Sequence, residues 1–594
     1  MAHSFVLGIL MLALGIQYSR ASQERDGRPQ KTYDFVIIGG GTAGNTIANR
    51  LTEDPTINVL VLEAGGTNEG VINSIIPNFC PRLIGTSADW NFTTTGQVGL
   101  SNRSIEYPRG HILGGSSSTN FLVYTRGTSE DYDRYASVTN DPTWSWVNVQ
   151  KFFARNERFT HSADHHNLSG QYDPNVHSTS GMTAVSLASL SSSFGPRVIQ
   201  ATSQLSNEFP FRLDMNSGSH LGVGWVQSTI DVNKRSSSAT SYLANPFNKR
   251  PNLHVQLNSQ VSRVLGSSDS PSHQQAFRTV EFRVGSGSLQ TVLATKEVIL
   301  SAGSIGTPTI LLNSGIGDPN ELSKINIKPV VNLPSVGKNL TDQPLLVNSW
   351  KVTATDTNDE VARNVTLAAQ QLLEWQTSGT GPLVNGIVDL LGWLRLPTNN
   401  TIFQDVSDPA AGPNTAHYEL VFQNAAGGPE PSGNFMSINT IVASPTSRGS
   451  VSLSSADPFK KPIIDPALLA SDEDMKVMIF ALRQAFQFLT APVWKNIVVG
   501  PIFNLTAKST DEQFMSYIRQ HTGTVFHPVG TAAMSAKNSH YGVVDPDLRV
   551  KGVTGLRIAD ASIFPFIPTA HPQAAVYVVG EKASDMIKST WNLK

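Results

Sequence analysis

A glycine-rich segment near the start of the chain has the spacing of a dinucleotide-binding turn. Gly39-Gly-Gly41-Thr42-Ala43-Gly44 satisfies G-x-G-x-x-G, follows the apolar run 34–38 and precedes a helix-like stretch over 45–51. Glycines there let the backbone turn tightly and approach a pyrophosphate, whose charge lies at the N-terminus of the following helix. A second apolar run, 59–62, ends at Glu63, whose carboxylate would accept hydrogen bonds from a ribose diol and repel a 2′-phosphate. The segment predicts an FAD or NAD site rather than NADP, with a glycine-rich turn of no function as the alternative.

Two further blocks resemble the signatures of one enzyme family. The segment Tyr107-Pro-Arg-Gly-His-Ile-Leu-Gly-Gly-Ser-Ser-Ser-Thr-Asn-Phe121 resembles the first signature of the glucose-methanol-choline (GMC) oxidoreductases, and 303–317 resembles their second. The resemblance runs from about Tyr33 to the C-terminus. Because those enzymes use FAD, it implies FAD rather than NAD.

The resemblance also implies how the cofactor is held. In relatives with covalent FAD a histidine immediately precedes the asparagine of the first block, and here that position is Thr119, so we expect non-covalent FAD. Small residues and backbone N–H groups over 114–118 suit a phosphate or a flavin edge, although a serine-rich loop would have the same composition. By the resemblance Asp560 contacts the cofactor; capping of the following helix is the alternative, and one side chain could do both. Beyond the glycine turn and Glu63, the expected contacts are Ala64, Leu113, Ser116, Asn120, Phe121, Leu122, Val123, Val261, Asp560, Ala561 and Gln573.

Two of the 14 histidines lie beside prolines in the C-terminal segment, His527 and His571. Oxidising an alcohol requires removal of the hydroxyl proton while the α-hydrogen leaves as hydride, and imidazole, with a pKa near 6.5, suits that task. A single histidine in such a stretch is more often structural, but the pair resembles the family's active-site couple. By that resemblance His527 is the base and His571 its hydrogen-bonding partner.

The substrate class is also inferred from resemblance. The block 527–535, the run 542–552 and the histidine pair look most like fungal aryl-alcohol oxidases, and Phe121 and Phe526 are expected to line an aromatic pocket, with core packing as the alternative. The expected reaction converts benzylic or related primary alcohols to aldehydes by hydride transfer to flavin N5, with O2 reduced to H2O2. The alternatives are a pyranose or other sugar dehydrogenase with quinone acceptors, an oxidase that tailors a secondary metabolite, and a non-catalytic flavoprotein or lyase on the same scaffold.

One stretch and two single positions depart from the aryl-alcohol oxidase pattern. The stretch 422–428 has only small residues after Asn424, where those oxidases contribute an aromatic side chain, so a more open pocket is expected. Pro572 replaces a usual threonine and Gln343 replaces a frequent histidine. Either replacement could alter substrate fit or oxygen reactivity.

These residues must be positioned by an α/β fold with the GMC architecture. We expect a discontinuous Rossmann-like FAD-binding domain over 33–128, 225–325 and 520–594, with strands near 298–301 and 556–559. An inserted α+β substrate-binding or cap domain is expected over 129–224 and 326–519. In the cap, Ser471 and Asp474 resemble a capping box, and an apolar stripe from Met475 to Leu489 predicts a helix packed on a core.

Composition supports a large globular protein. The 594 residues are 39% hydrophobic, enough for a large core. Their net charge of −2 argues against nucleic-acid binding through a basic surface. Cys80 is the single cysteine, so it cannot form an internal disulfide; we expect a small buried side chain rather than a thiol nucleophile. We expect a monomer without a metal site.

The N-terminus predicts secretion. An apolar run over 5–16 followed by small residues is typical of a signal peptide, which we place at 1–21; the run is too short for a membrane span, and an uncleaved anchor is the alternative. Seven Asn-x-Ser/Thr triplets fit an extracellular glycoprotein: Asn91, Asn102, Asn167, Asn339, Asn364, Asn399 and Asn504.

Overall fold

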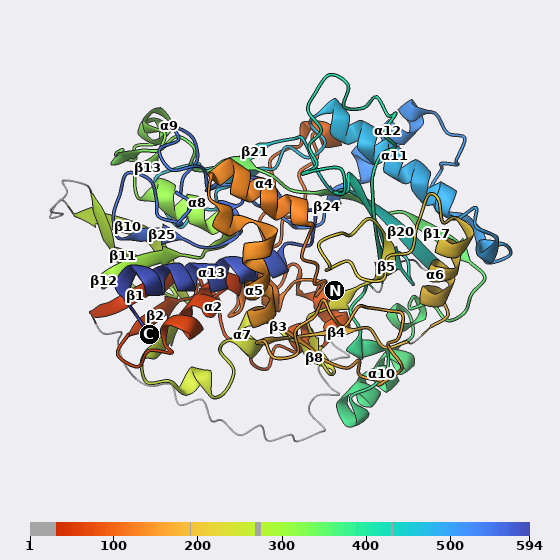
Figure 1. Ribbon diagram of the computed structural model, residues 1–594, viewed down its shortest axis with the longest axis horizontal. Coiled ribbons are helices and arrows are strands. Elements are labelled where there is room, and N and C mark those ends of the chain that lie inside the picture. Colours follow the sequence, from red (N-terminus) through yellow and green to blue (C-terminus); the bar gives the residue numbers. More distant parts are fainter. Residues whose placement is uncertain (1–30, 191, 268–274, 389, 429, 431) are drawn as a thin grey trace.

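Figure 1 shows the computed structural model of the chain, which describes residues 31–190, 192–267, 275–388, 390–428, 430 and 432–594. The predicted signal peptide lies outside these residues. Within the described part of the chain, no helix combines the length and the apolar character that crossing a membrane requires.

The two apolar runs that flank the glycine turn form adjacent parallel strands, β1 (Thr32–Ile38) and β2 (Val59–Leu62). They lie inside a seven-stranded sheet with the order β10-β11-β12-β1-β2-β9, in which β25 pairs with β12. The predicted strands near 298–301 and 556–559 are confirmed as the end of β12 and as β25. The other strands of this sheet are β9 (Leu253–Gln256), β10 (Ser259–Ser267), β11 (Ala276–Val284), β12 (Leu289–Leu300) and β25 (Leu556–Ile558).

Helices α2 (Thr42–Leu51) and α13 (Gln573–Trp591) lie side by side on this sheet (Figure 1). They approach closely because Gly580 has no side chain: a Cβ there would lie 2.8 Å from Cβ of Thr46. A salt bridge of 2.8 Å between Arg50 and Glu581 also joins them. The expected mixed α/β sheet with packed helices is therefore observed, and segments from opposite ends of the sequence meet in one layer.

A second seven-stranded sheet is antiparallel throughout. Its last strand, β24, ends three residues before His527, so the position of that histidine depends on this sheet. The boundaries between the FAD-binding domain and the cap domain stay a prediction. The strands are β16 (Pro344–Leu346), β17 (Ser349–Val352), β18 (Leu390–Leu394), β19 (Tyr418–Gln423), β20 (Asn434–Val442), β23 (Val498–Pro501) and β24 (Gly523–Thr524).

Helix α11 (Asp472–Phe488) packs on the second sheet, as its apolar stripe predicts. Ser471 caps it by accepting a hydrogen bond from the backbone N–H of Asp474. The return bond of a capping box is not among the hydrogen bonds of the described residues. The Asp474 carboxylate instead accepts from Thr446 and Ser447, which joins the helix start to a neighbouring loop.

The remaining elements connect the two sheets or cover them. Cys80 is buried, as expected, in a 3₁₀ segment (Pro77–Leu83), and burial raises its pKa to about 12. The other helices are α3 (Ile72–Ile75), α4 (Ser129–Thr139), α5 (Trp146–Asn156), α6 (Phe194–Gln204), α7 (Ser238–Ser241), α8 (Gly303–Asn313), α9 (Pro319–Lys324), α10 (Val365–Ser378) and α12 (Asp511–His521). The short strands are β3 (Glu157–Phe159), β4 (Thr183–Leu187), β5 (Gly222–Trp225), β6 (Gln227–Ser228), β7 (Ile230–Asp231), β8 (Lys234–Arg235), β13 (Ile316–Gly317), β14 (Val331–Asn332), β15 (Lys338–Leu340), β21 (Gly449–Ser452) and β22 (Ile463–Asp465).

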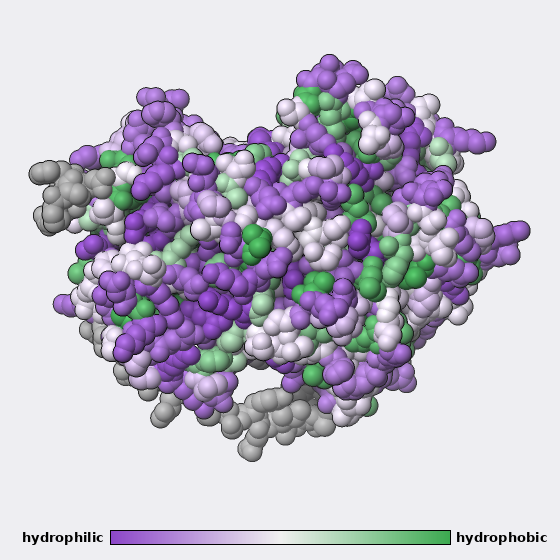
Figure 2. All heavy atoms as spheres, in the orientation of Figure 1, coloured by the Kyte–Doolittle hydropathy of each residue, from purple (hydrophilic) through white to green (hydrophobic). Residues whose placement is uncertain are grey.

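The face shown in Figure 2 is mostly polar, with apolar residues in separate small patches. Such scattered exposure is ordinary for a globular protein and marks no docking surface.

Candidate active site

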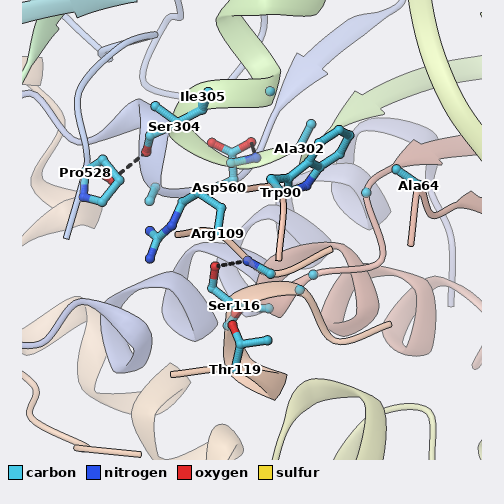
Figure 3. Close-up of a pocket in the computed structure, with 18 of the residues that line it drawn as sticks. Ala64, Trp90, Arg109, Ser116, Thr119, Ala302, Ser304, Ile305, Pro528 and Asp560 are labelled. Carbon is cyan, nitrogen blue, oxygen red and sulfur yellow. Dashed lines mark hydrogen bonds between the residues drawn. The ribbon is translucent and has the colours of Figure 1, made fainter. Parts of the chain in front are cut away.

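One cavity is bordered both by the carboxyl ends of β1 and β2 and by His527 and His571. Figure 3 shows side chains from distant segments gathered around it. Of the residues predicted to bind a cofactor or substrate, Gly44 and Leu113 are not on its wall. Those that border it are Gly39, Gly41, Thr42, Ala43, Glu63, Ala64, Ser116, Asn120, Phe121, Leu122, Val123, Val261, Phe526, His527, Asp560, Ala561, His571 and Gln573.

The glycines of the first turn have different physical roles. Gly39 has φ 103°, and a Cβ there would lie 2.4 Å from the carbonyl oxygen of Ser301. Gly44 packs against the turn itself, since a Cβ added at this position would lie 2.0 Å from the carbonyl oxygen of Gly39. Gly41 is open to the cavity, because the nearest described atoms would lie 3.9 Å from a Cβ at this position. The first two glycines therefore shape the turn, and Gly41 leaves room for a ligand.

The start of α2 has the donors that an anion needs. No side chain caps it, and its first turn contains no acidic residue. The leading N–H groups of a helix lack intrahelical partners and carry the positive end of the helix dipole. This end of the cavity is suited to a diphosphate.

Glu63 is buried beside the same turn. Its two carboxylate oxygens accept hydrogen bonds of 2.8 Å from the backbone N–H groups of Gly40 and Gly65. Burial raises its pKa to about 7 against the lowering effect of these bonds. The bonds hold the carboxylate at the end of β2, where each oxygen retains a lone pair for a hydroxyl group.

The second glycine block meets the first. Gly115 has φ 52° at the start of a 3₁₀ turn (Gly115–Ser118), and a Cβ on it would lie 2.9 Å from Cα of Gly41. Thr119 and Ser116 border the cavity here (Figure 3). His111 lies behind this wall, with its ring centroid 4.5 Å from that of Trp90. Because the two blocks touch, both can hold one extended ligand.

The two C-terminal histidines are neighbours in space. Their ring centroids are 4.7 Å apart with an interplanar angle of 77°, and each residue is 9% exposed. His571 is held by a 2.9 Å hydrogen bond from its backbone N–H to Oγ1 of Thr125. The predicted pairing of His527 with His571 thus has the required geometry, with both residues on the cavity wall.

The backbone around His527 is held in an unusual conformation. Phe526 has φ 66°, a region that costs free energy for a bulky residue. Thr524 accepts from the N–H of Phe526, and Arg109 donates to its carbonyl at 2.8 Å. The buried carboxylate of Asp342 accepts from the N–H of His527 at 2.9 Å. These bonds stabilise the turn that presents the imidazole to the cavity.

Gln343 selects the tautomer of His527. The amide nitrogen of Gln343 donates to the carbonyl of Ala443 at 2.8 Å, which directs its Oε1 to Nδ1 of His527 at 2.7 Å. Since an amide oxygen only accepts, Nδ1 carries the proton and Nε2 keeps its lone pair. Burial, with smaller contributions from His571 and Arg109, holds the His527 pKa well below its ordinary value. The result is a neutral imidazole ready to accept a proton.

Glu419 is a functional candidate that sequence reasoning missed. Its Oε1 lies 3.0 Å from Nε2 of His571, and the residue is fully buried on β19. Trp393 is its partner across the β18–β19 ladder. A carboxylate beside the apolar run 420–422 of this strand was the signal that could have identified it. By accepting from Nε2, Glu419 leaves Nδ1 as the His571 nitrogen available to a ligand.

Aromatic side chains form part of the wall near the histidines. The ring centroids of Phe121 and Phe526 are 6.1 Å apart, and both residues border the cavity. The small residues at 425–428 are not among the residues that border it in the described chain. Instead, Ala426 and Gly427 bind Asp359 and Ser349.

Asp560 and Gln573 use their polar groups within the protein. Asp560 accepts from the N–H of Gly303 and from Oγ1 of Thr307, and it caps the following 3₁₀ turn through Ser562, as predicted. Gln573 donates to the carbonyl of Val123 and accepts from Asn120. Both residues border the cavity while joining its walls together.

Comparisons with known proteins agree with this architecture. GMC oxidoreductase family models match residues 33–345 and 445–580. The chain is 39% identical to the dehydrogenase eriK of Hericium erinaceus over 95% of both chains. It is 36% identical to pyranose dehydrogenase 3 of Leucoagaricus meleagris over 99% of this chain and 98% of the relative.

Solved structures of similar shape include two fungal oxidases. A formate oxidase of Aspergillus oryzae has a TM-score of 0.87 at 28% identity, and a fungal aryl-alcohol oxidase has a TM-score of 0.81 at 27% identity. Each alignment covers 95% of this chain and 100% of the other. Since the family models together span most of the sequence, this chain belongs to the GMC oxidoreductase family.

Proposed function

We propose that the protein is an FAD-dependent oxidoreductase that converts an alcohol to a carbonyl compound, with His527 as the proton acceptor. The observation that carries this proposal is a neutral, tautomer-selected imidazole paired with a second imidazole in a cavity whose other end suits a dinucleotide. FAD, when bound, supplies the two-electron acceptor for the hydride that leaves the carbinol carbon.

The protein residues fit that cofactor. The N–H groups at the start of α2 would bind the diphosphate, and Glu63 would accept from the ribose hydroxyls. Thr119 occupies the position where covalent relatives have histidine, so the cofactor would be held by non-covalent contacts. The cofactor site extends along the wall formed by Ser116 and Asn120.

The protein's own groups account for the proton. Nε2 of His527 accepts the hydroxyl proton, and Nδ1 of His571 lies on the same side of the cavity to orient the hydroxyl group. Gln343 and Glu419 bind the opposite nitrogens of the two rings, so each ring presents a defined atom to the alcohol. Each histidine is only 9% exposed, so the pair is largely shielded from bulk solvent.

For the substrate we propose a benzylic or related primary alcohol, with O2 as the electron acceptor. The Phe121–Phe526 pair beside the base supports an aromatic ring in the pocket. The second candidate is sugar oxidation with a quinone acceptor, which the high coverage by pyranose dehydrogenases favours. An oxidase or dehydrogenase of secondary metabolism remains the further alternative.

One experiment separates these candidates. The purified yellow protein is mixed anaerobically with benzylic alcohols and with sugars, and flavin bleaching is followed by stopped flow. Bleaching by benzylic alcohols and peroxide release in air support the first candidate. Bleaching by sugars with turnover only on quinones supports the second, and no bleaching by any alcohol would contradict the alcohol oxidation itself.

Glu63→Ala is expected to weaken FAD binding. A hydrogen bond to a charged group contributes about 1.5–3 kcal/mol, so the dissociation constant should rise about 10- to 100-fold. FAD release is measured by flavin fluorescence after dialysis, with the exposed Glu69→Ala as control. Glu63→Gln keeps the side-chain size and should fall between the two. Full FAD retention by the alanine variant would refute the role of Glu63.

The pH dependence follows from the lowered pKa of His527. Protonation removes the base, so kcat/KM should fall only as the pH drops through the lowered value. We therefore expect kcat/KM to stay level from about pH 8 to below about 6.5, the ordinary pKa of histidine. An acid limb centred at or above that value would be inconsistent with a neutral His527.

We also propose that the protein is a secreted glycoprotein, on the basis of its N-terminal sequence and its sequons. Among those asparagines, Asn339 and Asn364 are half-buried, whereas Asn91, Asn102, Asn167, Asn399 and Asn504 are exposed. Mass spectrometry of the protein from a eukaryotic culture medium, before and after glycosidase treatment, tests both points.

A further inference from the structure

Arg235 places a positive charge inside the protein without a carboxylate beside it. Three arginines are buried in the described chain, and the other two pair with glutamates: Arg126 with Glu157 and Arg557 with Glu297. Arg235 is 4% exposed, and no salt bridge joins it to a described acidic residue. Its Nη2 has no hydrogen-bond partner among the described residues.

The other guanidinium nitrogens attach Arg235 to the cavity wall from behind. Nε donates to the carbonyl of Ser74, and Nη1 donates to the carbonyl of Ser117 and, at 2.7 Å, to Oδ1 of Asn120. Asn120 borders the cavity and in turn donates to Gln573 at 2.9 Å. Gln573 lies two residues after His571. The charge is therefore one side chain away from the cavity, on the side that leads to the histidine pair.

An unpaired buried cation is destabilising, because the charge loses its hydration and neutral acceptors offset only part of that loss. Burial lowers the Arg235 pKa to about 10, which still leaves the group charged at neutral pH. Water or a neutral side-chain donor could bind the three oxygens that accept from Arg235 without the cost of burying a charge. A negative charge that arrives in the cavity would offset it.

The proposed reaction delivers such a charge. The alcohol loses one hydride and one proton: His527 would take the proton, and FAD, when bound, would accept the hydride and so gain one net negative charge. The cofactor's diphosphate is also anionic, but the uncapped start of α2 already has donors for it. The link through Asn120 to Gln573 favours the flavin end as the place where the Arg235 charge acts.

Resting on the proposed FAD dependence, we infer that Arg235 is a positioning residue that acts through Asn120 as the buried counter-charge for the reduced flavin and so raises the midpoint potential of the bound cofactor.

The test compares charge with shape. Arg235→Met removes the charge at similar length, and Arg235→Lys keeps the charge but loses the forked hydrogen bonds. The equilibrium constant for flavin reduction by a reference dye is read from the absorbance spectra, without substrate. At an effective dielectric near 20, one unit charge acting over a distance of about 10 Å corresponds to about a tenfold change, so Arg235→Met should lower this constant about tenfold. Arg235→Lys should retain most of the wild-type value.

A second variant covers the case in which Arg235→Met does not fold with FAD. Asn120→Asp places a carboxylate against the intact guanidinium, so it should neutralise the charge in place and lower the reduction constant in the same direction. Arg158→Met is the control. Arg158 is 38% exposed and forms a salt bridge with Asp231, which lies in β7, the strand that pairs with the strand of Arg235. The reduction constant of this control variant should equal the wild-type value.

The outcomes separate this inference from the proposed function. An unchanged reduction constant in yellow Arg235→Met or Asn120→Asp protein overturns the role of Arg235 and leaves alcohol oxidation untouched. If the reduction constant decreased as much in Arg235→Lys as in Arg235→Met, the inference would also be overturned. The hydrogen-bonding shape of the side chain, and not its charge, would then be responsible. Wild-type protein that binds FAD but is not bleached by any alcohol contradicts the proposed function instead.

Discussion

Replacing His527 with alanine is expected to lower the rate constant for flavin reduction by alcohol about 10²- to 10⁴-fold, the usual contribution of a positioned general base. The physical reason is that Nε2 of His527 has a free lone pair, borders the cavity, and belongs to a ring that burial holds neutral. The measurement is anaerobic stopped flow at saturating alcohol, with bound FAD quantified by its absorbance.

The matched control is His540→Ala, which removes an exposed histidine of the same C-terminal segment. It should reduce at the wild-type rate. His571→Ala should lose less than His527→Ala, since His571 orients the oxygen and does not take the proton. Wild-type reduction by His527→Ala, with FAD bound, would show that another group is the base.

Replacing Gln343 with leucine should lower the same rate constant about 10- to 100-fold. The change removes the acceptor of the Nδ1 proton, so a buried donor is left unpaired and the ring is free to adopt the other tautomer. In that tautomer Nε2 carries the proton and cannot act as a base. Stopped-flow reduction and the pH profile of kcat/KM are the two measurements.

Gln343→Glu separates this role from simple packing. A carboxylate in place of the Gln343 amide would stabilise the protonated ring of His527. The His527 pKa should therefore rise, and the acid limb of kcat/KM should move to higher pH. A residue that only filled space would leave the position of the limb unchanged in both variants. An unmoved limb in Gln343→Glu, together with a normal rate in Gln343→Leu, would remove Gln343 from the mechanism.

The arrangement pairs each imidazole with a different acceptor. His527 faces a neutral amide, whereas His571 faces the Glu419 carboxylate. The two rings therefore differ electrostatically although they are 4.7 Å apart. This asymmetry supports the division into a base and an orienting partner.

Much of the fold could be predicted because its signals are local. The apolar runs 34–38 and 59–62 are buried-strand patterns, and the glycines between them permit the tight turn from β1 into α2, so β1, α2 and β2 form where expected. Helix α11 could also be predicted from the sequence, because its apolar residues recur with a period near 3.6 and so mark one buried face. The Asp474 side chain departs from the capping-box expectation because its donors Thr446 and Ser447 lie on another segment.

The sequence alone determined the family resemblance, the cofactor class and the identity of the two histidines, because short motifs encode local turns whose chemistry is independent of the rest of the chain. The tertiary structure decided which side chains control those histidines. Gln343 and Glu419 lie 184 and 152 residues from their partners. Arg235 owes its unpaired charge to burial behind a cavity wall. Contacts across such separations arise only when the chain packs into its tertiary structure, so a local pattern can mark a residue such as Glu419 as unusual but cannot identify its partner.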